Sequence, residues 1–551
     1  MDRVWLTNYP SSIPPDINAE VYSSLADFFE QVCEKYSKQN AFSNFGVDLT
    51  YSTLQNRVKS LAAYFQNVLQ LAPGTRIALM LPNLLQYPIA LCAALKAGMV
   101  VVNVNPLYTA DELKHQLNDA GAEVIIVLEN FAHTVAAVYN QTPLKHVLIT
   151  TMGDELGLIK GRLMNFVVKY IKQMVVPWEI AGAKTYKQAI AAGQKLNFSP
   201  PSIKLEDTAF LQYTGGTTGV AKGAILSHKN ILANIQQLLA WMKPYLTEGQ
   251  EIMITALPLY HIFSLTVNCM TFFGFGALNL LITNPRDISS MISMVSKFNF
   301  TCMTGVNTLF NGLLNHPKFS TLNFDSFHLT IGGGMAVQPS VAKRWKETTG
   351  TEIIEGYGLS ETSPVVSVNF PDIETYNGTI GVPLPSTFIS IQNEQEDILP
   401  FGEIGEICIK GPQVMEHYWN NPEETHRAFT STGWFRSGDV GTMDFKGYIK
   451  IVDRKKDMII ISGFNVYPNE VEGVLTQQPG ILEAAVIGVE DANANEQVKA
   501  FIVRNDPHLD EKAIIEYCRQ HLTAYKIPKI IEFCEELPKT PVGKILRRRL
   551  R

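Results

Sequence analysis

Short apolar runs alternate with stretches of helical periodicity along the first 350 residues, and this alternation restricts the fold more than any other feature. RIALML at 76–81 is followed by a helical stretch and then by MVVVNV at 99–104. Strands that are buried on both faces read as continuous apolar runs, and helices connect neighbouring parallel strands. The pattern therefore predicts an α/β fold with parallel sheets.

The same alternation recurs around two glycine-rich segments. AFLQY at 209–213 reads as a strand, and the pattern after the following loop predicts a helix capped by Ser227. FHLTI at 327–331 reads as another strand, followed by GGG and by a helix that Pro339 opens and Gly350 ends. Each of these strands is therefore expected to lead into a glycine-rich loop.

The last hundred residues change to shorter elements. The predicted elements are helices near 468–477 and from Asp510, and strands near 484–489, 498–503 and 530–534. This mixture is typical of a small α+β domain. The charged run DRKKD at 453–457 precedes it and is expected to act as a hinge.

Composition and charge narrow the function. With 551 residues, of which 46% are apolar and 18% charged, the chain is expected to be globular with more than one domain. A formal charge of -6 argues against nucleic acid as a partner. The seven cysteines are scattered without CxxC spacing, which argues against disulfides and zinc. The N-terminus MDRVWLTNYP has no apolar signal region, so a cytoplasmic location is expected.

Two segments raise the question of membrane contact. Residues 264–284 carry no charge, but asparagines and glycines interrupt them, which favours a buried helix followed by a buried strand over a bilayer span. In 160–178, apolar residues recur at helical spacing and Arg162, Lys169 and Lys172 occupy the remaining positions. The second pattern fits either an ordinary surface helix or a peripheral helix on the anionic inner face of the cytoplasmic membrane.

The most specific motif is YTGGTTGVAKGA at 213–224. Glycines allow the backbone N–H groups of such a loop to approach phosphate oxygens closely, and the threonine hydroxyls and Lys222 can add to these contacts. Lys222 is followed by Gly223 rather than by Ser or Thr, so the loop is not a Walker P-loop. The motif predicts a phosphate-binding loop of another kind.

This loop resembles the phosphate loop of the adenylate-forming (AMP-binding, ANL) superfamily, which contains acyl-CoA synthetases, luciferases and peptide-synthetase adenylation domains. The further motifs of that family follow in order: LPLYHIF at 257–263, GGGM at 332–335, YGLSET at 357–362, STGWFRSGDVG at 431–441, DRKKD at 453–457, SGFNVYPNEVE at 462–472 and PKTPVGKILRR at 538–548. The C-terminal third and the opening VWLTNYP are most similar to bacterial long-chain-fatty-acid CoA ligases.

The resemblance implies a domain arrangement. A large N-terminal domain, 1–452, is expected to contain two α/β sheet lobes and a β-barrel-like lobe. A hinge at 453–458, with Lys456 as the pivot, is expected to join it to a small, mobile α+β domain at 459–551.

The resemblance also assigns roles to individual residues. The phosphates of ATP are assigned to Lys222, the amides of Gly215, Gly216 and Gly219, and the hydroxyls of Thr214, Thr217 and Thr218. Glu361 and Thr217 are expected to hold Mg²⁺, a hard cation that takes one or two protein ligands when phosphates supply the rest. Adenine is expected between Tyr357 and Gly333.

The remaining assignments concern the ribose, the acid and the cofactors. Asp439 and Arg454 are expected at the ribose, His261 at the acyl carboxylate and Lys544 at the reacting phosphorus. Thr217, Glu361, His261 and Lys544 are the expected catalytic residues. Further cofactor contacts are assigned to Gly358, Thr362 and Gly463.

The resemblance therefore implies an enzyme that joins a long-chain fatty acid to CoA through an acyl adenylate, using ATP and Mg²⁺ and releasing AMP and pyrophosphate. Three alternatives stay open: activation of a medium-chain or aryl acid, transfer to a carrier protein, and a catalytically dead lipid-binding relative. A homodimer is also left open.

Overall fold

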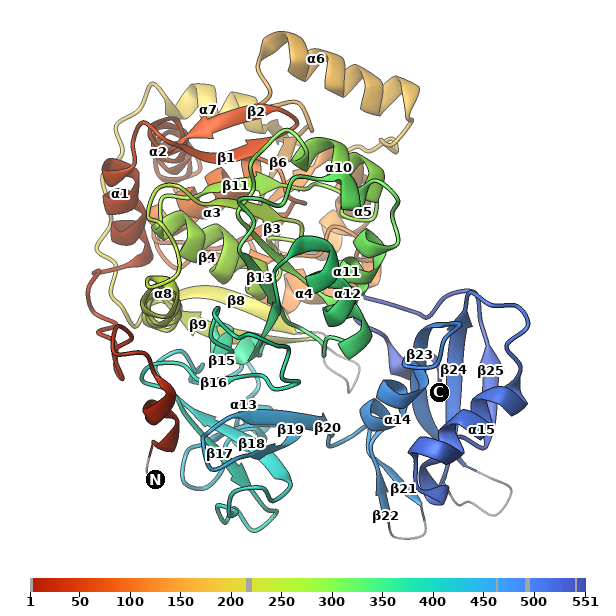
Figure 1. Ribbon diagram of the computed structural model, residues 1–551. Coiled ribbons are helices and arrows are strands. Elements are labelled where there is room, and N and C mark those ends of the chain that lie inside the picture. The colour runs from red at the N-terminus through yellow and green to blue at the C-terminus, as the bar shows by residue number, and fades with distance from the viewer. Residues whose placement is uncertain (1–2, 215–220, 462–463, 491–495, 541–542) are drawn as a thin grey trace.

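The computed structural model describes residues 3–214, 221–461, 464–490, 496–540 and 543–551. Within these ranges, seven-, nine- and four-stranded sheets form the large N-terminal part, and a three-stranded and a two-stranded sheet follow in the small C-terminal part. Figure 1 shows the small part, in blue, beside the lower half of the large one. The predicted fold class is confirmed.

The first lobe is built on the seven-stranded sheet, in the order β7-β6-β5-β3-β4-β8-β9. Its strands are β3 (Arg76–Met80), β4 (Val100–Asn103), β5 (Val124–Leu128), β6 (His146–Thr150), β7 (Lys184–Thr185), β8 (Thr208–Thr214) and β9 (Lys222–Ser227). All neighbours are parallel except β8 and β9. The strands expected at 76–81, 99–104 and 209–213 are thus confirmed as β3, β4 and β8.

The second lobe is built on the nine-stranded sheet, in the order β16-β15-β14-β13-β12-β10-β11-β1-β2. Its strands are β1 (Asn40–Asn44), β2 (Val47–Thr50), β10 (Ile252–Thr255), β11 (Leu278–Leu281), β12 (Cys302–Gly305), β13 (Leu329–Gly332), β14 (Ile353–Gly358), β15 (Val365–Val368) and β16 (Val382–Pro383). β13 starts two residues later, and ends one residue later, than the strand predicted at 327–331.

Helices cover the faces of these two sheets. In the large part they are α1 (Leu25–Lys35), α2 (Tyr51–Asn67), α3 (Gln86–Lys96), α4 (Ala110–Ala120), α5 (Ala132–Val138), α6 (Leu158–Phe166), α7 (Tyr186–Gly193), α8 (His228–Met242), α9 (Ile262–Ser264), α10 (Ile288–Val295), α11 (Asn307–Leu314), α12 (Pro339–Thr349) and α13 (Pro422–Ala428). The predicted cap Ser227 accepts a hydrogen bond from Asn230 N, and Gly350 ends α12 with φ +80°.

The cores lie on both faces of each main sheet. On β3, Ile77 and Leu79 face a cluster that includes α2, α3 and α8, whereas Ala78 and Met80 face another beneath α4 and α5. A third cluster packs α10, α11 and α12 on the nine-stranded sheet. Burial on both faces explains why the strands are continuous apolar runs.

Two further units complete the chain: an antiparallel third lobe, and the small part, in which β23 and β24 are antiparallel and β24 and β25 are parallel. The third lobe contains β17 (Phe388–Gln392), β18 (Gly405–Lys410), β19 (Phe435–Met443) and β20 (Ile449–Arg454). The small part contains β21 (Ile459–Ile461), β22 (Phe464–Val466), α14 (Pro468–Leu475), β23 (Ile481–Glu490), β24 (Glu496–Arg504), α15 (Glu511–His521) and β25 (Ile530–Phe533). Every element predicted for the last hundred residues is present.

The uncharged segment 264–284 is buried, as expected. It forms a π-helical turn (Leu265–Phe272) that packs on α8 and then β11 in the interior of the nine-stranded sheet. No helix in the described part of the chain has the length and apolar character that a bilayer crossing requires.

The basic segment 160–178 differs from the prediction at its end. α6 continues as a π-helical turn (Val167–Ile171), and no helix is present over 173–178. Most apolar side chains of α6 and of the residues that follow it are exposed to solvent. They are Leu158, Ile159, Leu163, Phe166, Tyr170, Ile171, Met174 and Val176. Figure 1 shows α6 projecting at the top of the molecule, away from the small domain.

Candidate active site

The predicted site residues gather where several strands end. Thr214 ends β8, Gly332 ends β13 and Gly358 ends β14, while the loop after β10 leads to His261. Ligands of α/β sheets bind at the carboxyl ends of the strands, where the loops leave space and free backbone groups. The topology therefore brings motifs that are far apart in the sequence to one edge.

Part of the predicted phosphate loop is outside the described residues. Those site residues are Gly215, Gly216, Thr217, Thr218, Gly219 and, from a later motif, Gly463. Both ends of the loop lie within the described residues. Thr214, at the end of β8, pairs with Lys222, at the start of β9, in the antiparallel register of these strands. The predicted loop thus starts and ends on one pair of strands.

Lys222 points toward a segment that the sequence did not single out. Its ammonium forms an ion pair with Glu424 on α13, and it lies 5.5 Å from the ring centre of Tyr418. The residues on either side of Tyr418 are fixed to β9 by backbone hydrogen bonds, Ile225 N to His417 O at 3.2 Å and Trp419 N to Gly223 O at 2.8 Å. A phosphate that binds the Lys222 ammonium would therefore compete with the Glu424 carboxylate.

Glu361 lies in a 3-10 turn directly after β14. Its Oε1 accepts a hydrogen bond of 2.6 Å from the Tyr418 hydroxyl. Its second carboxylate oxygen has no hydrogen-bond partner among the described residues. A fixed carboxylate with one oxygen remaining suits a hard divalent cation, so Glu361 fits the predicted Mg²⁺ ligand.

The adenine turn and the YGLSET motif lie against each other. A Cβ on Gly333 would lie 3.3 Å from the Gly356 carbonyl oxygen, and one on Gly358 would lie 2.0 Å from the Pro364 carbonyl oxygen. At Gly358 only glycine allows this approach, whereas a side chain at Gly333 would require its neighbours to shift by a few tenths of an ångström. Thr362 is fully buried and closes the turn after Gly358 through its hydroxyl. It therefore shapes the loop rather than facing the site.

Asp439, the predicted ribose ligand, is already engaged by two other predicted site residues. It accepts a hydrogen bond of 2.6 Å from the Tyr357 hydroxyl, and its other carboxylate oxygen forms an ion pair of 3.0 Å with Arg454 Nε. Burial, followed by the negative charge of Asp439, raises the pKa of Tyr357 well above its usual value. Tyr357 therefore stays protonated and acts as a donor. The structure brings these three residues together as the resemblance implies.

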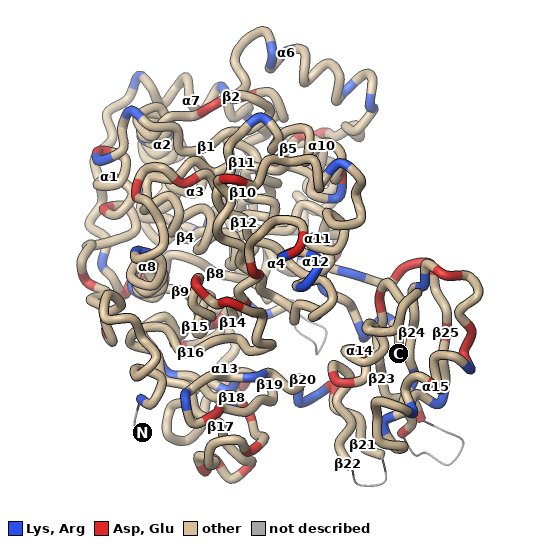
Figure 2. Tube along the Cα trace, viewed as in Figure 1, with Lys and Arg blue, Asp and Glu red and all other residues tan. Residues whose placement is uncertain are grey.

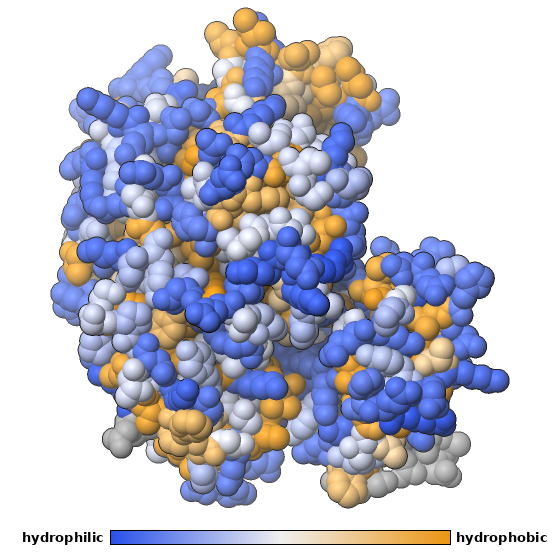
Figure 3. All heavy atoms as spheres, in the orientation of Figure 1, coloured by the Kyte–Doolittle hydropathy of each residue, from blue (hydrophilic) through white to orange (hydrophobic). Residues whose placement is uncertain are grey.

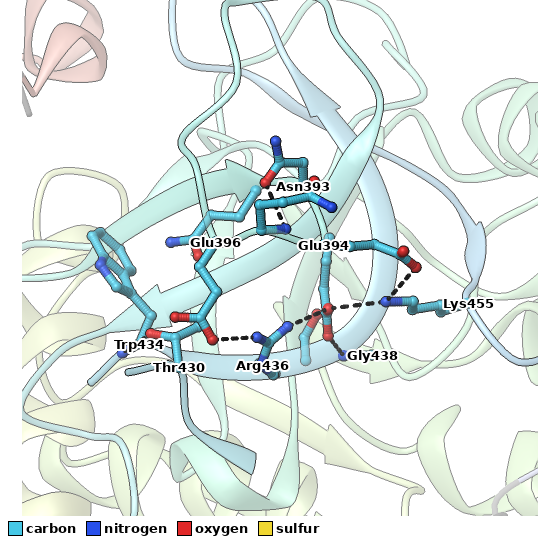
Figure 4. A network of polar contacts seen from close by, with 12 residues as sticks. Asn393, Glu394, Glu396, Thr430, Trp434, Arg436, Gly438 and Lys455 are labelled. Carbon is cyan, nitrogen blue, oxygen red and sulfur yellow. Dashed lines mark hydrogen bonds and ion pairs between the residues drawn. The ribbon is translucent and has the colours of Figure 1, made fainter. Parts of the chain in front are cut away.

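A network of ion pairs around Arg436 and Lys455 supports β19, the strand that carries Asp439 (Figure 4). Arg436 lies 2.6 Å from Glu396 and 3.2 Å from Glu406. Glu406 in turn accepts a hydrogen bond from Gly438 N at 3.2 Å and pairs with Lys455 at 3.7 Å. The network thus joins the part of β19 before Asp439 to Lys455 in the predicted hinge.

Lys544 reaches the large domain close to His261. Burial, followed by the charge of Arg454, lowers the pKa of Lys544 to about 8. Burial, followed by the charge of Lys544, lowers the pKa of His261 to about 4, so the imidazole is neutral at neutral pH. The Thr308 hydroxyl donates a hydrogen bond of 3.3 Å to the Gly543 carbonyl. This contact fixes the lysine loop on α11.

The basic tail is not simply solvated, because Arg547 anchors the lysine loop. Its guanidinium donates to both carboxylate oxygens of Glu472 at 2.8 Å and lies 3.4 Å from Asp457. Arg551 lies 3.3 Å from the same Asp457. The segment that carries Lys544 is therefore tied to the acidic residues beside the predicted pivot Lys456, whose own side chain is exposed.

Another group of potential metal ligands lies at the opposite edge of the nine-stranded sheet. Glu251, Cys302 and His328 converge at the starts of β10, β12 and β13. The Glu251 carboxylate already accepts hydrogen bonds from Thr247 N at 2.7 Å and from the Thr301 hydroxyl at 2.6 Å. These contacts make the cluster a hydrogen-bond network that joins the ends of neighbouring strands.

Sequence reasoning missed the partners of the predicted residues. Glu424, Tyr418 and Thr308 contact Lys222, Glu361 and the Lys544 loop, respectively. They lie outside the recognised motifs, in stretches such as YWNNPEETH at 418–426 that carry no spacing signal of their own. Only their proximity in space reveals them.

Known proteins resemble this chain over nearly its whole length. The AMP-binding enzyme family model matches residues 29–419, and the AMP-binding enzyme C-terminal domain model matches residues 470–544. Curated relatives include a long-chain-fatty-acid–CoA ligase from Escherichia coli O6:H1, 52% identical over 551 residues and covering 100% of this chain and 98% of the relative. The enzyme of the same name from Haemophilus influenzae is 47% identical over 553 residues with the same coverage.

Solved structures give the same result. ATP-bound MatB from Rhodopseudomonas palustris superposes with a TM-score of 0.82 at 27% identity, covering 96% of this chain and 98% of that one. The two family models together account for both the large and the small part of the fold. From its motifs, its topology and these full-length similarities, the chain belongs to the AMP-binding enzyme family.

Proposed function

We propose that this chain is an AMP-forming acid–thiol ligase that converts long-chain fatty acids to acyl-CoA. The observation that carries the proposal is the convergence of Lys544, from the small domain, with His261 and the Asp439–Arg454 pair of the large domain. The full-length similarity to long-chain-fatty-acid–CoA ligases supports the substrate class. ATP, CoA and a fatty acid are the substrates of this proposal.

In the first half-reaction, the acid carboxylate attacks the α-phosphorus of ATP, and pyrophosphate leaves. Both reactants are anionic, so a site that supplies positive charge and oriented donors lowers the barrier. Lys544 contributes a cation from the small domain, while Lys222 and the 214–222 loop serve the β and γ phosphates. His261 is neutral and can donate a hydrogen bond to the acid without adding charge.

The nucleoside is held by Tyr357, Asp439 and Arg454. The Asp439 carboxylate can accept hydrogen bonds from the ribose hydroxyls, and its contacts with the other two residues keep it fixed for this purpose. Glu361, with Thr217, would hold Mg²⁺, which neutralises phosphate charge when bound.

In the second half-reaction, the CoA thiol attacks the adenylate carbonyl carbon and AMP leaves. We propose that the small domain, 459–551, turns about Lys456 relative to the large domain, 1–452, so that the SGFNVYP segment, 462–468, replaces Lys544. Lys455 and Lys456 are exposed within the polar run 454–457, which supports a pivot at this point, since a hinge must absorb changes in φ and ψ while it stays solvated.

The substrate class can be tested with acid-dependent ATP–pyrophosphate exchange over a series of fatty acids. Burial of one methylene contributes about 0.8 kcal/mol, so apparent affinity should rise roughly fourfold per added carbon until the acyl channel is full. AMP and acyl-CoA should accumulate when CoA is added. Release of ADP, or preference for acetate, aryl acids or amino acids, would contradict the proposal.

The alternatives make different predictions. Ligases for medium-chain or aryl acids would show an optimum at those acids in the same series. Transfer to a carrier protein would show no turnover with free CoA. A catalytically dead lipid-binding relative would bind fatty acid without exchange, yet Lys222, Glu361, Asp439 and Lys544 are all present in the sequence, which favours an active enzyme.

We also propose that α6 and its π-helical extension contact an anionic membrane surface from the cytoplasmic side. Ile159 is 87% exposed and Leu158 77% exposed, and Figure 3 shows apolar atoms gathered at this projecting tip. Between Gly157 and Trp178 the chain has four cations and no Asp or Glu, and Figure 2 shows only Lys and Arg coloured on α6. Apolar side chains interleaved with cations are typical of peripheral membrane helices.

Reversing two charges tests this contact. Each Lys near an anionic surface contributes about 1 kcal/mol, so the double variant Lys169→Glu, Lys172→Glu should bind anionic vesicles at least about tenfold more weakly at low salt. Lys512→Glu with Lys529→Glu, two exposed lysines of the small domain, is the control of equal net charge. Equal vesicle binding by the two double variants would exclude this helix as the membrane contact.

A further inference from the structure

A closed ring of hydrogen bonds lies directly behind the adenine turn. Glu355 on β14 is 6% exposed, and its Oε1 accepts a hydrogen bond of 2.7 Å from Val337 N. The Tyr376 hydroxyl lies 2.7 Å from Glu355 Oε2 and 2.7 Å from the Val337 carbonyl oxygen. The ring thus joins β14 to the end of the 333–337 turn and to the 369–379 segment.

Counting protons in this ring determines the charge of the carboxyl group. The Tyr376 hydroxyl has one proton, and the Val337 carbonyl oxygen can only accept, so both contacts are hydrogen bonds only if this proton is donated to Val337. The contact between Tyr376 Oη and Glu355 Oε2 then requires a proton on Glu355. With an ionised Glu355, either this contact or the one to Val337 would bring two lone pairs together at 2.7 Å.

The surroundings of Glu355 agree with a neutral acid. Burial, as the largest cause, raises its pKa to about 7, against the opposing effects of Tyr376 and Val337 N. Tyr376 is the titratable side chain that contacts the carboxyl, and no Lys, Arg or His among the described residues forms an ion pair with it. A buried carboxyl without a cation is more stable in its neutral form.

The ring is placed where it can control nucleotide binding. Gly332 pairs with Glu355 in the register of β13 and β14, and the next residue, Gly333, begins the turn. Tyr357 lies two residues beyond Glu355 on β14. Both walls of the proposed adenine pocket, Gly333 and Tyr357, therefore depend on how the turn is held against the strand.

We infer that Glu355 is a positioning residue whose neutral carboxyl group locks the 333–337 turn onto β14, and that ionisation of this group loosens the turn and weakens nucleotide binding. The inference rests on the proposed role of Gly333 and Tyr357 at the adenine. In the ring, Val337 N–H donates to Glu355, Glu355 O–H donates to Tyr376, and Tyr376 O–H donates to the Val337 carbonyl. Loss of the Glu355 proton leaves the ring one bond short.

Glu355→Gln is the matched variant, because an amide can accept from Val337 N and donate to Tyr376 but cannot ionise. If only the neutral form binds, ATP affinity of the unsubstituted protein should fall about tenfold at one pH unit above the pKa of Glu355. The Glu355→Gln variant should lack this fall in ATP affinity. It should keep the pH dependence of ATP affinity that comes from the titration of Lys544. Tyr376→Phe should weaken ATP binding at every pH, because it removes the central hydroxyl.

Direct ATP binding and infrared spectroscopy between pH 5.5 and 9, values chosen to bracket about 7, test the inference on the full chain. The C=O band of a protonated carboxyl should be present at low pH, titrate near neutrality and be missing in Glu355→Gln. This band does not depend on catalysis, so a wrong substrate assignment would leave it intact. The inference is overturned if the band is unchanged in Glu355→Gln, or if that variant keeps the full pH dependence of ATP affinity.

Discussion

Lys544→Ala should lose acid-dependent ATP–pyrophosphate exchange by about 10²- to 10³-fold while still converting synthetic acyl-AMP to acyl-CoA. The loss follows because the variant removes a cation that is oriented toward the charge developing at phosphorus, in a partly buried site. The second half-reaction needs no such cation, since its nucleophile is a thiol and its leaving group is AMP. Radiolabelled pyrophosphate exchange and a thioester assay on the purified variant measure the two steps separately.

The charge of Lys544 also gives this prediction a pH dependence. Its pKa is lowered to about 8, so in the free enzyme the cation is present below this pH and is lost as the pH rises through it. Exchange in the unsubstituted enzyme should therefore decline above about pH 8, whereas Lys544→Arg should retain its charge. Arg548→Ala, which removes an exposed cation from the same tail, is the control for net charge. Equal loss of both half-reactions in Lys544→Ala would contradict the proposed division of labour.

Glu361→Gln should lower adenylate formation about 10²-fold and raise the Mg²⁺ concentration needed for half-maximal ATP binding. Glutamine can still accept the hydrogen bond from Tyr418, so the variant changes the charge and leaves the local contact in place. A neutral amide is a poorer ligand for a hard divalent cation than a carboxylate. Mg²⁺ titrations of ATP binding, followed calorimetrically, measure the effect without relying on turnover.

Tyr418→Phe and Glu423→Gln separate the causes of this effect. Tyr418→Phe keeps the Glu361 charge but removes the hydroxyl that orients it, and the loss of such a supporting partner typically costs 10- to 100-fold in metal affinity. Glu423 is an exposed carboxylate that pairs with Arg427 on the surface, so Glu423→Gln should leave the Mg²⁺ requirement unchanged. An unchanged Mg²⁺ requirement in Glu361→Gln would exclude Glu361 as the metal ligand.

These predictions differ in how far the sequence alone could support them. Lys544 and Glu361 stand in recognisable motifs, so their roles were expected before any geometry was known. Tyr418 and Glu355 were not expected, because neither stands in a pattern that distinguishes it from an ordinary core or loop residue. Their importance comes from hydrogen bonds to residues distant in the chain, at Glu361 and Tyr376, respectively.

The sequence by itself determined the local elements. β3, β4 and β8, the Ser227 cap, the end of α12 at Gly350 and the order of elements in the small domain all follow from apolar periodicity and from capping and turn residues. These signals act over a few residues, so each segment can be predicted from its own sequence.

Only the tertiary structure determined which distant segments and side chains are in contact. Strand order in the two large sheets, the ion pair of Lys222 with Glu424, the approach of Lys544 to His261 and the proton on Glu355 all depend on packing between segments far apart in sequence. Likewise, periodicity predicted an amphipathic segment at 160–178, but only the fold showed that its apolar side chains face solvent. The charge state and the exposure of these side chains depend on burial and on contacts between distant segments. The local sequence pattern does not contain this information.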